Sequence, residues 1–108
     1  MIVWVGDCPG HTKFCHDKGD TWDKYLNGLP DVRPMEEIIK DIKDRGIFLL
    51  LTKFTKYVDF MFTNIEKIFK DDGKENQVKR VPLDSNDTSS FLNQISEDVN
   101  TIIATEFM

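Results

Sequence analysis

The sequence predicts an α/β fold, a small three-stranded and mostly parallel sheet with flanking helices. Two observations support this prediction. Short apolar runs at residues 2–5, 47–51 and 77–83 alternate with segments in which apolar residues recur at helical spacing. Such alternation is typical of parallel strands joined by right-handed crossovers, with helices on both faces of the sheet. We expect one domain over residues 1–108, in the order strand, loop, helix, strand, helix, strand, helix.

The first apolar run, IVWV, is rich in β-branched and aromatic residues and ends at Gly6, which predicts a buried strand. A polar stretch rich in Gly, Pro and Asp follows, up to about residue 33, with one helical turn expected at residues 21–26. Loops longer than about 12 residues are often functional. We therefore expect functional groups in this loop.

The first helix is expected to begin at Pro34 and to end at Arg45 and Gly46. Its apolar stripe consists of Met35, Ile38, Ile39 and Ile42. The run IFLLL at residues 47–51 is typical of a strand covered on both faces. A single helix from residue 47 to 70 is the alternative, and we favour strand then helix because Gly46 is a stop signal.

The second helix is expected over residues 55–70, ending at Asp72-Gly73. Its apolar stripe consists of Val58, Met61, Phe62, Ile65, Ile68 and Phe69. A third strand follows at residues 77–83, with Pro82 near its end. Asp87, Thr88 or Ser89 is expected to cap a last helix, in which helical spacing is kept by Leu92, Ile95, Val99, Ile102 and Ile103.

The charge balance argues against a nucleic-acid ligand. Fourteen Lys and Arg residues stand against nineteen Asp and Glu residues, a net charge of -5, and the basic residues are scattered among acidic ones. A nucleic-acid binder usually shows a basic stripe that neutralises phosphates. No segment approaches the roughly 20 apolar residues that cross a bilayer, and the first residues do not resemble a signal peptide. With only two cysteines, we expect a cytoplasmic protein with reduced thiols and no membrane partner.

The loop after the first strand, GDCPGHTKFCHDKGD, holds the densest set of metal-ligating side chains: Asp7, Cys8, His11, Cys15, His16, Asp17 and Asp20. Ligands of parallel α/β sheets bind beyond the carboxyl ends of the strands, where this loop lies. Cys8, His11, Cys15 and His16 offer zinc-binding atoms, although their spacing matches no standard zinc site. In the alternative interpretation the histidines cap turns and the cysteines pack as small apolar residues.

Other chemistries receive less support from this loop. Six residues separate the cysteines, in contrast to the Cys-x-x-Cys of thioredoxin-like sites. Nothing in the sequence marks a histidine and an oxyanion-binding group around either thiol. The loop also lacks a Walker A motif and a Gly-x-Gly-x-x-Gly motif for nucleotide phosphates. The candidate metal residues are therefore Asp7, His11 and His16.

Several segments in order resemble the von Willebrand factor A-like domain found beside α-kinase catalytic domains in eukaryotic microbes. They are the strand followed by GDCPGH, then CHDKGD, NGLPDVRPMEEIIKDIKDRGI, FTKYVDFMFTNIEKIF and VKRVPLDSNDTSSFLNQI. The resemblance implies strands four to six of a doubly wound, Rossmann-like sheet with strand order 3-2-1-4-5-6. It implies an interaction module, and it gives no reason to expect kinase activity.

In that family a metal-ion-dependent adhesion site combines Asp-x-Ser-x-Ser after strand one, a Thr from a later loop and an Asp after strand four. The resemblance places Asp7 at the last of these positions, while DTSSF at residues 87–91 follows the wrong strand. No certain cofactor is therefore expected. Mg²⁺ or another divalent cation is expected only where a partner completes the site.

The same resemblance predicts an open sheet edge, because the family's strand four pairs with its strand one, which has no counterpart here. Unpaired edges of apolar strands are templates for another chain. We expect a protein partner, or self-association, at the edge formed by Ile2, Val3, Trp4 and Val5. The predicted function is a non-catalytic interaction module or a subunit of a larger assembly. The alternatives are a small metal- or thiol-dependent enzyme that uses the loop from Asp7 to Asp20, and an acidic inhibitor protein.

Overall fold

The computed structural model describes residues 1–19, 21–82 and 88–106 and confirms the predicted order of elements. Three parallel strands form one sheet in the order β1-β2-β3, with Ile2 opposite Leu49 and Leu49 opposite Val78. The strands are β1 (Ile2–Gly6), β2 (Leu49–Lys53) and β3 (Val78–Pro82). The α-helices are α1 (Met35–Asp44), α2 (Asp59–Asp71) and α3 (Thr88–Glu106), and short 3₁₀ helices occupy Lys56–Val58 and Glu75–Gln77.

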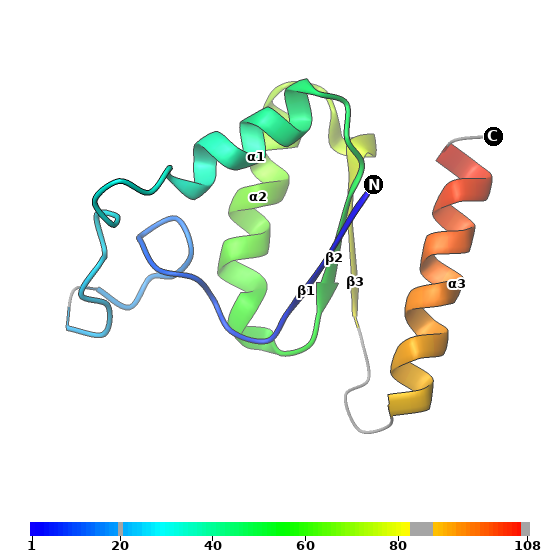
Figure 1. Cartoon of the computed structure of the whole chain (residues 1–108), viewed down its shortest axis with the longest axis horizontal. Coiled ribbons are helices and arrows are strands. Elements are labelled where there is room, and N and C mark those ends of the chain that lie inside the picture. The colour runs from blue at the N-terminus through cyan, green and yellow to red at the C-terminus, as the bar shows by residue number, and fades with distance from the viewer. Residues whose placement is uncertain (20, 83–87, 107–108) are drawn as a thin grey trace.

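The helices form a layer on each side of the sheet. Figure 1 shows α1 and α2 on one side and α3 on the other. Two hydrophobic cores result, a larger one between the sheet and helices α1 and α2 and a smaller one between the sheet and α3. Side chains alternate along β2, so Leu49 and Leu51 belong to the larger core and Leu50 belongs to the smaller core. The larger core also contains the buried stripe of α2, and the smaller one contains Phe48, Val81 and Ile102.

The larger core depends on a close approach between β1 and α2. The rings of Trp4 and Phe62 meet edge to face, with centroids 6.1 Å apart. Gly6 makes this approach possible, because a Cβ atom there would lie 3.2 Å from both Phe62 and Val58. Phe62 is completely buried, which places it at the centre of the contact between sheet and helix.

Helices α1 and α2 end in the same motif, as the glycines at positions 46 and 73 predict. The Ile47 N–H donates to the Ile42 carbonyl and the Lys74 N–H donates to the Phe69 carbonyl, each spanning five residues. Gly46 and Gly73 both have a φ of +69°, the left-handed conformation that this helix end requires. The Gln77 side-chain amide also donates to the carbonyls of Ile42, Lys43 and Ile47 at the end of α1.

Some details differ from the predicted elements, and one alternative is excluded. The middle strand starts at Leu49 instead of residue 47, because Ile47 still takes part in the end of α1. The helical turn expected at residues 21–26 is a series of turns without a helix. The alternative of one helix over residues 47–70 is wrong, since β2 ends at Lys53 and Thr55 caps the next helical segment through the Tyr57 N–H.

Burial of the first strand was also wrongly predicted. Ile2 and Val3 are each 38% exposed and Val5 is 42% exposed. These side chains are exposed because β1 is at the edge of the sheet and pairs with β2 on one side only. A β-branched run therefore identifies a strand here without deciding whether the strand is central or at an edge.

Replacing Phe62 by alanine should lower the free energy of unfolding by about 3–5 kcal/mol, the usual cost of deleting a buried aromatic ring. Phe60→Ala is the matched control on the same helix, because Phe60 is 39% exposed. Its effect should stay within about 0.5 kcal/mol. Urea unfolding followed by circular dichroism measures both variants, and equal losses would contradict this assignment of the core.

Candidate functional site

The open edge of β1 presents backbone groups to solvent. The Ile2 N–H donates to the Phe48 carbonyl and the Gly6 carbonyl accepts from the Phe54 N–H, both at 2.9 Å. Alternate residues of a strand direct their backbone groups to the same neighbour, so residues 2, 4 and 6 face β2. The N–H and C=O groups of Val3 and Val5 point the other way, where no strand of the described ranges lies.

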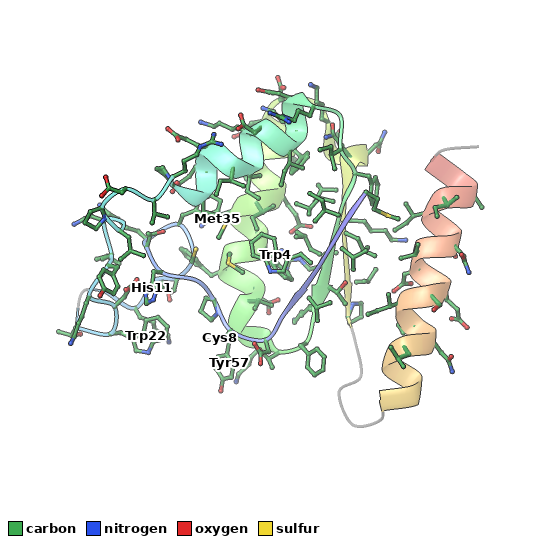
Figure 2. The ribbon with its side chains drawn as sticks, viewed as in Figure 1. Trp4, Cys8, His11, Trp22, Met35 and Tyr57 are labelled. Carbon is green, nitrogen blue, oxygen red and sulfur yellow. The ribbon has the colours of Figure 1, made fainter. Side chains whose placement is uncertain are left out.

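Apolar side chains accompany these backbone groups. Val3 and Val5 share the sheet face on which α3 packs, because they lie beside Leu50 and Thr52 in the register. Helix α3 covers Leu50 and Val81 through Val99 and Ile102, and this smaller core does not include Val3 or Val5. Trp4 lies between β1 and α2 (Figure 2), with its ring packed against Phe62. Ile2, Val3 and Val5, the other residues of the predicted edge, are exposed.

The second candidate is a histidine–aspartate cluster in the loop of residues 7–34. Its centre is Asp23, whose side chain is fully buried. Each of its oxygens accepts two hydrogen bonds: Oδ1 from His11 Nδ1–H at 2.7 Å and the Tyr25 N–H at 2.8 Å, and Oδ2 from His16 Nε2–H and the Thr12 N–H, both at 2.7 Å. Four donors from four positions therefore meet on one carboxylate.

The hydrogen bonds also determine the tautomer of His16. The Lys18 N–H donates to His16 Nδ1 at 3.1 Å, so this nitrogen is an acceptor and Nε2 carries the proton given to Asp23. The His16 ring is buried and meets the Trp22 ring edge to face, with centroids 4.5 Å apart. Both ring nitrogens of His16 are thus engaged inside the loop.

His11 is held in a different way. Its Nδ1 donates to Asp23, but the side chain is 59% exposed and packs edge to face with Tyr25. The ring helps to line a surface groove of about 790 Å³ between the loop and the start of α1. The groove is lined by apolar side chains such as Leu29, Val32 and Met35, together with charged ones of both signs, Lys13, Arg33 and Glu36.

The electrostatics of the cluster favour an ionised Asp23. Desolvation of the buried carboxylate opposes ionisation. The hydrogen bonds from His16, the Thr12 and Tyr25 N–H groups and His11 outweigh desolvation and hold the pKa of Asp23 well below its usual range. A buried anion with all its acceptor positions engaged stabilises the loop that surrounds it.

The structure brings together only part of the predicted ligand set. His11 and His16 meet on Asp23, whereas the Asp7 carbonyl accepts a hydrogen bond from the Thr55 hydroxyl beside the ends of β1 and β2. Cys8 is exposed and Cys15 is buried in the larger core. Asp17 is exposed, and Asp20 lies outside the described residues.

A metal centre of the adhesion type does not fit the residues present. Asp7 supplies one carboxylate, and the described ranges bring no group of three His, Cys, Asp or Glu side chains together around a possible ion. The nitrogen atoms that His11 and His16 direct inward donate to Asp23, so both rings have the turn-holding role of the alternative interpretation.

Asp23 was not predicted from the sequence, because the metal-ligating side chains are densest at residues 7–20 and Asp23 lies outside this segment. A local signal was present. Aspartate often accepts a hydrogen bond from the backbone N–H two residues later, and Asp23 does so with Tyr25. The expected helical turn concealed this, since side chains of a helix project outward from its axis.

Asp23→Asn should destabilise the chain at pH 7, because an amide group presents donors where two donors already converge. A carboxylate whose pKa is depressed by folding stabilises the folded state above the ordinary carboxyl pKa of about 4, and this contribution is lost as the pH falls below it. The difference between wild type and variant should therefore be large at pH 7 and shrink towards pH 3 in urea unfolding. Asp17→Asn, an exposed carboxylate of the same loop, should match wild type throughout.

The two thiols should differ sharply in reactivity. Burial raises the pKa of the Cys15 thiol, and the side chain is inaccessible, whereas Cys8 is exposed. An aromatic disulfide reagent should label one thiol of the native chain rapidly and the second only after denaturation. Cys8→Ser should abolish the rapid phase, and rapid labelling that survives this change would contradict the buried position of Cys15.

Comparison with known proteins adds no relative. No family model, curated protein or solved structure matches the chain. The resemblance to von Willebrand factor A-like domains therefore stays a prediction, while the three-stranded parallel fold is a property of the structure. Within the described residues, no helix is long and apolar enough to span a lipid bilayer.

Proposed function

We propose that the chain is a non-catalytic protein-interaction module, or one subunit of a larger assembly, that receives a further β-strand along β1. One observation carries the proposal. The backbone groups of Val3 and Val5 are directed away from the sheet, and the side chains around them are apolar and about 40% exposed. Strand addition satisfies such groups and buries such side chains in one step.

The position of α3 also supports β1 as the interaction surface. Helix α3 packs on β2 and β3, so the part of the sheet face that carries Val3 and Val5 stays accessible beside it. A strand added at β1 would continue this face and lay its own side chains next to the two valines. The site would then join backbone hydrogen bonds to apolar contact, which is the usual basis of β-strand recognition.

The alternative functions have less support. A thiol enzyme built on Cys15 and His16 would need an accessible thiolate and a free imidazole nitrogen, whereas burial raises the pKa of Cys15, and Asp23 and Lys18 occupy both nitrogens of His16. An acidic inhibitor needs free carboxylates gathered on one face. Several carboxylates are instead engaged by cations of the chain itself, as in the pairs Arg33–Asp41, Lys53–Asp59 and Lys43–Asp72.

A photo-crosslinking amino acid at position 3 tests the proposal in the cells that produce the protein. We expect irradiation to attach a polypeptide at this position, because a strand paired with β1 lies within reach of the side chain. The same amino acid at position 32, where an exposed valine lies on the distant loop, is the matched control. Mass spectrometry of the adducts identifies the attached polypeptide.

The proposal also predicts the effect of a charge at the edge. Val5→Lys should strongly reduce the adduct formed at position 3, because a strand placed there would cover the ammonium group. Val32→Lys should leave the adduct unchanged. Equal labelling at positions 3 and 32, or no adduct at position 3, would show that β1 is not the interaction surface.

A further inference from the structure

We infer that the strand received by β1 is β1 of a second copy of this chain, paired antiparallel about a two-fold axis that passes beside Trp4. This inference rests on the proposed function and names its partner. It would join the two sheets into one continuous sheet in which β1 is no longer an edge.

The free backbone groups of β1 are arranged symmetrically about Trp4. They belong to Val3 and Val5, one residue to each side. In an antiparallel pair, two opposite residues of a hydrogen-bonded pair exchange both of their bonds. Placing Val3 opposite Val5 of the second copy therefore satisfies every outward N–H and C=O of both residues in both chains, with the two Trp4 residues facing each other at the axis.

The side chains agree with the same register. A two-fold axis perpendicular to the sheet keeps each face on its own side, so the valines of both copies meet on the face that carries α3. Val3 and Val5 are 38% and 42% exposed in the single chain, and this pairing would cover them with each other. On the opposite face, Ile2 and Trp4 of one copy would lie near the same residues of the other.

Charge favours a second copy over a differently charged partner. The chain has a net charge of -5, yet residues 1–6 contain no charged side chain. Self-pairing of most surfaces of an acidic protein brings like charges together. At β1 it brings only apolar side chains together, while a basic partner would find no carboxylate on this strand with which to pair.

Disulfide trapping in purified protein tests the register. In a Cys8→Ser background, the chain with Val3→Cys is mixed with the chain with Val5→Cys and mildly oxidised. The inferred pairing sets these cysteines directly opposite, at a Cα separation of about 5.5 Å that a disulfide spans. Two Val3→Cys chains would instead face each other diagonally at about 7–8 Å, beyond easy reach. We expect disulfides between positions 3 and 5 to exceed those between identical positions. A chain with Val32→Cys should form a disulfide with neither the Val3→Cys chain nor the Val5→Cys chain.

Light scattering completes the test with variants that keep the core of the chain. Wild type should show the mass of two chains at high concentration, and Val5→Lys should weaken association by more than about tenfold. Val32→Lys should associate like wild type. A wild-type chain that stays monomeric, a dimer that Val5→Lys leaves intact, or disulfides mainly between identical positions would each overturn the inference. If a different polypeptide is crosslinked at position 3 of a monomeric chain, the inference fails while the proposed function stands.

Discussion

The central strand β2 is the constraint on which the other elements depend. Leu49, Leu50, Leu51 and Thr52 are all completely buried, since both edges of β2 are paired and both faces are covered. One short strand thus belongs to two cores. A parallel sheet of three strands has only one such interior position, so β1 and β3 must be edges however apolar they are. The exposure of β1 follows from this arrangement more than from its own sequence.

The loop of residues 7–34 is ordered by a different interaction. Its described residues, 7–19 and 21–34, contain no helix or strand, and their structure depends on side chains that reach inward. Cys15 enters the larger core, the Asn64 side chain donates to the Phe14 carbonyl, and Asp23 joins the two histidines to the backbone. Thr12 has a φ of +88°, an unfavourable conformation for a β-branched residue, and its N–H bond to Asp23 helps to hold it there.

The sequence predicted the elements of the fold well because their signals are local. Apolar stripes at helical spacing marked α1 and α2, and glycines 46 and 73 marked their ends through a backbone conformation that glycine adopts readily. Which residues of each element are buried was predicted less well. Ile38 lies within the expected stripe of α1 yet is 40% exposed, because it lines the surface groove beside the loop and is not part of the larger core.

The candidate sites show the same division between local and distant information. The edge at residues 2–5 could be predicted only through the resemblance, in which the strand that would pair with this run has no counterpart, and not from the β-branched run itself. The Asp23 cluster could not, since four donors spread from residue 11 to residue 25 converge through turns that no periodic pattern encodes. His11 and His16 were identified as residue types, but their common partner was visible only in three dimensions.

The placement of the two tryptophans gives the chain two built-in optical reporters. Trp4 packs against Phe62 between the sheet and α2, whereas Trp22 is 54% exposed and packs against the His16 ring in the loop. The emission of Trp4 is expected at shorter wavelengths and reports on the packing between β1 and α2. The emission of Trp22 is expected at longer wavelengths and reports on the structure of the loop. The emission spectrum therefore separates events at the strand edge from events in the histidine–aspartate loop without any added label.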